Sequence, residues 1–238
     1  MLKTITHLKG FSIRGLDGDL GTVEQLYFDQ QSWTVRYLTV DTGRWLENRR
    51  VLISPFSIQR VNWQARRIEV SILKEQLEKS PEIDVQQPIS RQHEISHLGY
   101  FGYPHYWADG AQETKGSHLR SAGAISGYDI QATDGEIGHV SGLVLDDETW
   151  AIRYIEVSTR NWWPNHKVVI APAWIQRVNW MSSKVYLELS RAAIQSAPEY
   201  LDSMEMNREY EIRLYSHYKR PTYWQGAEIA QALLLSEA

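Results

Sequence analysis

Apolar and polar residues alternate with a period of two along most of the chain. This pattern is typical of β-strands that bury one face and expose the other. Strands are predicted at Gly21–Asp29, Trp33–Thr42, Arg50–Ile53, Ser57–Trp63 and Arg66–Ile72. Asp17-Gly18 has the composition of a type I′ hairpin turn. About six short strands in roughly 65 residues, with closely spaced turns, favour a small closed or nearly closed β-barrel.

Short helical segments follow the strands. Leu73–Ser80 has helical character and ends before Pro81, and a second helix is expected near Arg91–His97. An aromatic tail then ends at Trp107. We therefore expect a helix-and-tail segment to follow each set of strands.

The same pattern occurs twice, at an offset of 117 residues. Between Gly10 and Trp63, 24 of the 54 paired positions are identical, and Ile58–Trp63 recurs letter for letter as Ile175–Trp180. A period this long indicates a tandem domain duplication, because the units of a solenoid are only about 20–50 residues long. We therefore predict an all-β protein with short helices. It is built of two tandem small β-barrels, each followed by a helical and aromatic tail. The predicted domains are residues 1–112 and 113–238, with a polar linker at 108–119.

The strand Trp33–Thr42 carries apolar side chains on both faces. Leu38 and Val40 lie on one face, and Val35 and Tyr37 lie on the other. A strand of an antiparallel barrel is normally apolar inside and polar outside, so the second apolar face needs a cover. We expect the trailing helix and aromatic tail to supply it, with packing of one barrel on the other as the alternative.

The motifs G-x-V-x-x-L-x-x-D, W-x-x-R-Y-x-x-V-x-T, V-x-I-x-P and I-Q-R-V-N-W occur in this order in the first copy. Together they are similar to the PRC-barrel family, and the second copy is the better match. The resemblance implies small β-barrels. Such barrels are known from the cytoplasmic part of the photosynthetic reaction-centre H subunit and from a domain of a ribosome-maturation factor. In both settings the barrel works through protein–protein contact.

Composition excludes several function classes. The net charge of −4 lacks the basic excess expected of a nucleic-acid binder. Without cysteine, the chain has no disulfides, thiolate zinc sites or thiol nucleophiles. No apolar run approaches the roughly 18 residues that a transmembrane helix needs, and the first ten residues do not resemble a signal peptide. We expect a cytoplasmic protein without a cofactor.

One motif suggests enzymatic chemistry. His93-Glu94-Ile95-Ser96-His97 matches H-E-x-x-H, in which two histidines bind zinc and the glutamate acts as a base. A third ligand could come from His105, Glu113 or His118. The second copy has Tyr210-Glu211-Ile212-Arg213-Leu214 at this place, so a zinc site would exist in one copy only. The alternative interpretation is structural: Arg91 pairs with Glu94 across the helix, as Arg208 would with Glu211.

We therefore predict a non-enzymatic adaptor or assembly module without catalytic or cofactor-binding residues. Its protein partner is unknown, and a homo-oligomer is possible. The candidate interaction residues are Trp45, Trp162 and Trp163, which form a contact patch if they are exposed. Two alternatives remain open: an accessory protein of photosynthesis related to the H subunit, and a metal-dependent hydrolase that uses His93, Glu94 and His97.

Overall fold

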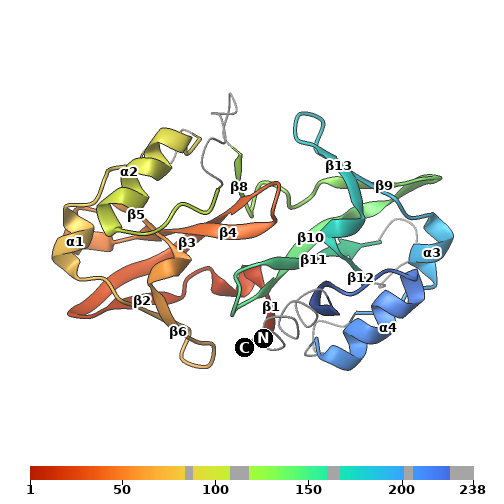
Figure 1. Ribbon diagram of the computed structural model, residues 1–238, viewed down its shortest axis with the longest axis horizontal. Helices are drawn as coiled ribbons and strands as arrows, with labels where there is room; N and C mark the ends of the chain where they lie inside the picture. Colours follow the sequence, from red (N-terminus) through yellow and green to blue (C-terminus); the bar gives the residue numbers. More distant parts are fainter. Residues whose placement is uncertain (84–87, 108–117, 160–166, 201–205, 226–238) are drawn as a thin grey trace, which may run out of the picture. The chain divides into compact units, whose positions relative to one another are not determined.

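The protein is mostly β with short helices, and its strands form two seven-stranded mixed sheets (Figure 1). The computed structural model describes residues 1–83, 88–107, 118–159, 167–200 and 206–225. Among these residues no helix has both the length and the apolar character that crossing a membrane requires.

The first sheet has the spatial order β5-β4-β3-β2-β7-β6, with β8 added beside β3. Its strands are β2 Ser12–Gly15, β3 Gly18–Asp29, β4 Thr34–Asp41, β5 Arg50–Ile53, β6 Ile58–Asn62, β7 Arg67–Val70 and β8 Leu119–Ser121. The β2–β7 pair is parallel, and the other neighbours are antiparallel. The strands of the first copy that were predicted from the apolar pattern are therefore confirmed to within a few residues at their ends.

The second sheet repeats this order as β12-β11-β10-β9-β14-β13, with β1 added beside β10. Its strands are β1 Leu2–Thr4, β9 Asp129–Ala132, β10 Gly135–Asp146, β11 Ile152–Ser158, β12 Lys167–Ile170, β13 Ile175–Asn179 and β14 Lys184–Leu187. Each added strand precedes one copy in the sequence but joins the sheet of the other copy. β1 precedes the first copy but joins the second sheet, whereas β8 precedes the second copy but joins the first sheet.

The predicted barrels are not confirmed. Within the described residues each sheet is open, since no pairing joins its end strands, β5 and β6 in the first sheet. The short 3-10 turn η3, Pro55–Ser57, separates these two strands along the chain. Proline has no backbone N–H to donate to a ladder, so sheet pairing stops where this turn begins.

The helices lie where the sequence predicts them. They are α1 Lys74–Glu78, α2 Arg91–Phe101, α3 Arg191–Gln195 and α4 Arg208–Tyr218, and the other 3-10 turns are η1 Ile5–Leu8, η2 Gly43–Leu46 and η4 Pro172–Trp174. The α2 helix begins after Ser90, whose Oγ accepts a hydrogen bond from the backbone N–H of His93 at 3.2 Å. It ends at Gly102, which adopts a left-handed conformation with φ of 69°. Both caps follow the usual preferences of helix ends.

The cover over the second face of β4 is the expected helix. Tyr37 is fully buried, and its ring meets the His97 ring of α2 edge-on at 5.3 Å between centroids. In Figure 1, α2 lies beside β5, and the His97 Nε2 is 3.0 Å from the carbonyl oxygen of Leu52 in that strand.

A close backbone approach explains one glycine that both copies share. A Cβ atom on Gly21 would lie 2.1 Å from the carbonyl oxygen of Asp41, and one on Gly138 would lie 2.0 Å from that of Ser158. These distances leave no space for a methyl group. The long strands β3 and β10 can therefore approach the ends of β4 and β11 this closely only at glycine.

The predicted type I′ turn at Asp17-Gly18 is wrong. Gly15 pairs with Gly18, so the two turn residues are Leu16 and Asp17, and neither has a positive φ. Gly18 instead begins β3 with φ of 147°.

The chain divides into two units. The first contains Lys3–Ser126 and Gly142–Ile155, and the second contains Gly127–Ser141 and the residues from Glu156 onward. The predicted boundary between residues 112 and 113 falls within 108–117, outside the described residues. The division into domains 1–112 and 113–238 therefore stays a prediction.

Candidate interaction site

A fully buried carboxylate organises the polar groups around α2. Glu94 has no exposed surface. Its Oε1 lies 3.4 Å from Arg91 Nη1 and 3.1 Å from His118 Nε2, and its Oε2 accepts a hydrogen bond from the Tyr106 hydroxyl. A buried charge is tolerated when it is paired and hydrogen-bonded. Arg91 supplies the pairing charge, and Tyr106 supplies the hydrogen bond.

The network also assigns the proton on His118. Its Nε2 lies 2.8 Å from the Tyr106 hydroxyl oxygen, as well as close to Glu94. The carboxylate only accepts hydrogen bonds, and the tyrosine has already donated its one proton to it. His118 Nε2 therefore carries a hydrogen and donates it to the Tyr106 hydroxyl oxygen, while it lies 3.1 Å from Glu94 Oε1.

Two tyrosines near Glu94 are held in the protonated form. Burial raises the pKa of Tyr37 and that of Tyr106 far above the usual value for a phenol, and the neighbouring Glu94 charge adds to both shifts. A phenolate at either position would lose its hydration and face a carboxylate. Both hydroxyl groups are therefore protonated at physiological pH, and that of Tyr106 donates to Glu94.

The two histidines of the H-E-x-x-H motif lie in different surroundings. His97 is almost completely buried, and burial lowers its pKa to about 4. The ring is therefore neutral, and its Nε2 donates to the Leu52 carbonyl. His93 is partly exposed, and burial also lowers its pKa.

This arrangement does not favour the zinc hydrolase. Glu94 is occupied by Arg91, His118 and Tyr106, so it is not available as a base toward a bound water. In the part of the chain that the structure describes, no group of three or more His, Asp or Glu side chains is placed to hold a metal ion. Of the suggested third ligands, Glu113 lies outside the described residues.

The structural interpretation of the motif is confirmed in both copies. Arg208 Nη1 lies 3.1 Å from Glu211 Oε2, and the Tyr223 hydroxyl donates to Glu211 Oε1 at 2.9 Å. The guanidinium carbon of Arg208 lies 3.9 Å from the Trp224 ring centroid, and the equivalent distance from Arg91 to Trp107 is 3.8 Å. In each copy the arginine therefore fixes the aromatic tail to the helix that precedes it.

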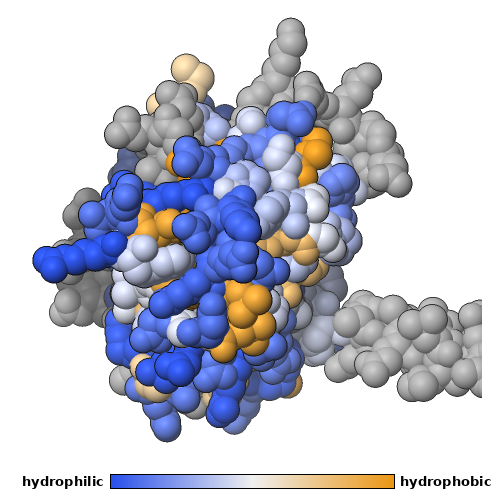
Figure 2. Space-filling model, turned by 90° about the vertical axis from the view of Figure 1, so that its left-hand side faces the viewer, coloured by the Kyte–Doolittle hydropathy of each residue, from blue (hydrophilic) through white to orange (hydrophobic). Residues whose placement is uncertain are grey.

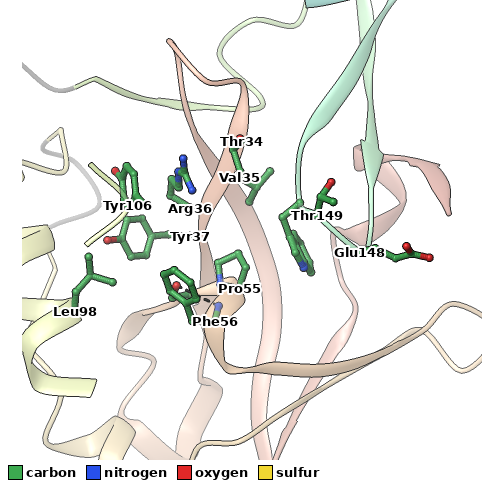
Figure 3. A pocket seen from close by; sticks show the side chains of 12 residues that line it. Thr34, Val35, Arg36, Tyr37, Pro55, Phe56, Leu98, Tyr106, Glu148 and Thr149 are labelled. Atoms are coloured by element: carbon green, nitrogen blue, oxygen red, sulfur yellow. Dashed lines mark hydrogen bonds between the residues drawn. The ribbon is translucent and has the colours of Figure 1, made fainter. Parts of the chain in front are cut away.

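A pocket of about 210 Å³ opens beside the Glu94 network, and all of its lining residues belong to the first unit. The walls come from β4, η3, α2 with its tail, and the turn between β10 and β11. They include Arg36, Tyr37, Phe56, Leu98, Tyr106 and Trp150. In Figure 3, Arg36, Tyr37, Leu98 and Tyr106 gather on the left, Thr149 and Glu148 lie on the right, and Pro55 and Phe56 lie between them.

Arg36 is the cation of this pocket. Its guanidinium carbon lies 3.9 Å from the Tyr106 ring centroid, and its Nη2 donates to Ser32 Oγ at 3.2 Å. Burial lowers the pKa of Arg36, while the charges of Asp29 and Glu94 act in the opposite direction. Its Nε is buried without a hydrogen-bond partner among the described residues.

Residues 2–77 match the model of the PRC-barrel domain. The match assigns this segment, about a third of the chain, to the PRC-barrel family. The PRC-barrel match extends from β1 into α1 and therefore covers most of the first copy. A search among curated proteins finds no match to the chain.

The family match lies in the first copy. The expectation that the second copy is the better match stays a prediction. The tandem duplication of this domain stays a prediction. The match itself points to a small interaction domain and favours neither a hydrolase nor a role related to the reaction centre.

Only one of the three candidate tryptophans is described. Trp45, in η2 of the PRC-barrel segment, is partly buried, and its Nε1 donates to the Leu20 carbonyl at 2.9 Å. It is thus fixed at the end of the sheet and is not a freely exposed platform. Trp162 and Trp163 lie outside the described residues.

Sequence reasoning did not find the pocket. Its walls combine β4 of the PRC-barrel segment with Trp150, which is separated from that strand by more than a hundred residues. The signal that could have led to it is Arg36, a charged residue inside an apolar strand. A charge at such a position requires a specific environment.

Proposed function

We propose that the chain is a non-enzymatic interaction module, which joins a partner protein into an assembly through its first unit. The observation that carries this proposal is an aromatic cluster that extends outward from Phe56 in the pocket wall. Phe56 is 51% exposed and Tyr100 is 41% exposed. The Tyr103 ring lies 5.7 Å from Phe56 and stacks at 5.6 Å on Phe101.

Exposed aromatic side chains of this kind support a contact surface. Aromatic residues are enriched at the centres of protein interfaces, and a few of them usually carry most of the binding energy. The second copy lacks the feature: Ala173 replaces Phe56, and the next residue, Trp174, is only 2% exposed. The cluster is therefore particular to the first copy.

The surface pattern agrees with a local contact. Figure 2 shows a largely hydrophilic face on which apolar residues gather in a few small patches. Small patches on a polar surface are typical of a monomer with specific contact sites, whereas large apolar faces indicate permanent interfaces.

The chemistry beside the pocket also supports binding. Glu94, Tyr37 and Tyr106 are buried, and the pKa shifts of the two tyrosines keep them protonated. Catalytic groups are usually tuned toward the working pH, whereas these tyrosines are shifted away from it.

A capture experiment tests the proposal. Tagged full-length protein would be used with lysate of the source cells, and captured proteins would be identified by mass spectrometry. The wild type would be compared with Phe56→Glu and with Met181→Glu, which changes a residue that is 100% exposed in the second copy. We expect partners that the wild type and the Met181 variant share and the Phe56 variant loses. Identical sets from all three proteins would contradict the proposal.

A further inference from the structure

We propose that the pocket beside Arg36 receives an acidic side chain of the partner protein, together with an apolar side chain next to it in the partner's sequence. This inference rests on the proposed function, because it names the chemistry that the interaction module would recognise. Its basis is charge complementarity at a half-buried arginine.

The second copy shows what an arginine at this position requires. Arg153, the equivalent of Arg36, places its Nη2 3.2 Å from Asp146 Oδ2. Asp29 is the equivalent of Asp146, but its Oδ1 accepts hydrogen bonds from the backbone N–H groups of Gln31 and Ser32, at 2.7 Å and 3.0 Å. Among the described residues, Arg36 forms no ion pair.

A carboxylate from a partner protein would give Arg36 the ion pair that Arg153 already has in the second copy. The Arg36 guanidinium has the neutral Ser32 hydroxyl as its hydrogen-bond partner within the described residues, and its buried Nε has none. Arginine presents its N–H groups in a planar fork that matches the two oxygens of a carboxylate. Stacking on Tyr106 holds the guanidinium plane in place, so little side-chain freedom is lost when the carboxylate binds.

The size of the pocket favours a side chain over a cofactor. Its volume of about 210 Å³ lies below the roughly 300–1,000 Å³ of ordinary small-molecule pockets. The apolar part of the wall is formed by Phe56, Leu98 and Trp150. One apolar side chain fits this wall, and the aromatic cluster outside it offers contact to the neighbouring residues of an extended segment.

The opposite side of the pocket carries a negative charge. Glu148 lines it, but its side chain is 83% exposed. Water and salt screen an exposed charge strongly. Its repulsion therefore weakens a bound carboxylate less than the half-buried Arg36 stabilises it, and it disfavours a second acidic residue at that side.

A titration with blocked peptides tests the inference without the natural partner. Purified full-length protein, labelled with ¹⁵N, would be titrated with acetyl-Gly-Phe-Glu-Leu-Gly-amide and with the matching glutamine peptide. We expect saturable shifts of the Trp150 indole signal with the glutamate peptide, and at least about tenfold weaker binding of the glutamine peptide. The reason is that a charge-assisted hydrogen bond is lost. Raising the salt concentration to 1 M should lower the affinity of the glutamate peptide and leave that of the glutamine peptide unchanged.

Matched variants locate the charge. Arg36→Gln should lower the affinity for the glutamate peptide at least about tenfold. Arg60→Gln, at an exposed position of β6 that does not line the pocket, should leave it unchanged. Arg36→Lys keeps the positive charge and should give an intermediate affinity, and this variant decides the question if Arg36→Gln fails to fold.

Four results would overturn the inference. They are equal affinity for the two peptides, an equal loss in the two glutamine variants, no peptide binding at millimolar concentration, and tighter binding of 3-phenylpropionate than of the peptide. The last result would identify a small-molecule site. If the capture experiment finds partners that depend on Phe56 while neither peptide binds, the proposed function stands. The inference that the pocket receives an acidic side chain is then rejected.

Discussion

Arg36 and Tyr106 are stacked, with the guanidinium carbon 3.9 Å from the ring centroid, and the hydroxyl of the same tyrosine donates to the buried Glu94. The face of the ring attracts a cation, while its hydroxyl stabilises an anion. One residue of the aromatic tail thus connects the pocket with the polar network under α2. Substitutions in the Glu94 network should therefore change both the free energy of unfolding and the affinity of the pocket for a peptide.

Removal of the Tyr106 hydroxyl should destabilise the first unit. Tyr106→Phe keeps the ring below Arg36 but takes a donor from a fully buried carboxylate. We expect the free energy of unfolding to fall by about 1–3 kcal/mol, measured by urea denaturation followed by tryptophan fluorescence. Tyr100→Phe is the control, since its hydroxyl bonds the Gln76 carbonyl at the exposed surface. Equal losses in both variants would refute the buried hydrogen bond.

The charge of Glu94 should matter more than that of an exposed glutamate. Glu94→Gln leaves Arg91 and His118 without their carboxylate partner, and loss of one member of a buried pair costs about 3–5 kcal/mol. Glu75→Gln breaks the solvent-exposed pair with Lys79 and should change stability little. Thermal unfolding of the two variants measures the difference, and a small effect at Glu94 would show that the network is not essential.

His97 should make stability depend on pH. Its pKa is about 4 in the folded protein, because of burial, and 6.5 without that burial. Between these values the unfolded chain binds more protons than the folded one, so stability that is present above pH 6.5 is lost as the pH falls toward 4. The shift corresponds to about 3 kcal/mol in total.

The second copy supplies the variant for this test. His97→Leu introduces the residue found at the equivalent position, Leu214. Urea denaturation at several values between pH 7 and pH 4 should show a shallower decline than in the wild type. His7→Gln, at an exposed position of η1, should leave the decline unchanged. An unaltered slope in His97→Leu would assign the pH dependence to other groups.

Gly21→Ala should be strongly destabilising. The added methyl group would lie 2.1 Å from the Asp41 carbonyl, at a residue with φ of 144°. Steric overlap and an unfavourable φ together cost on the order of 3 kcal/mol. Gly43→Ala has φ of 61° but open space around the new methyl group, so its loss should be near 1 kcal/mol. Calorimetry on both variants measures the two losses, and similar melting temperatures would contradict the role of close approach.

Local signals were sufficient for most elements. Alternation predicted the long strands β3 and β4, and the capping residue Ser90 lies where α2 begins. Three-residue strands such as β1 and β8 have too few positions to show a period, and they form because a neighbouring edge is available. The turn at Leu16 and Asp17 was mistaken because the adjoining glycine serves the strand and not the turn.

The candidate site was less accessible from sequence, because its members are distant along the chain. The pairing of Arg91 with Glu94 follows from helix spacing and was predicted. His118 reaches Glu94 only because β8 pairs with β3 and so returns the chain to the first unit. Spacing alone therefore suggested a metal motif, whereas the structure surrounds Glu94 with Arg91, His118 and the Tyr106 hydroxyl that donates to it.

The exchange of β1 and β8 has a consequence for evolution as well as for engineering. A chain severed at residue 112 would leave its first sheet without β8 and its buried carboxylate without His118. Each sheet therefore includes a strand from the part of the chain that precedes the other copy. Neither half could be lost or exchanged during evolution without damage to the sheet of the other.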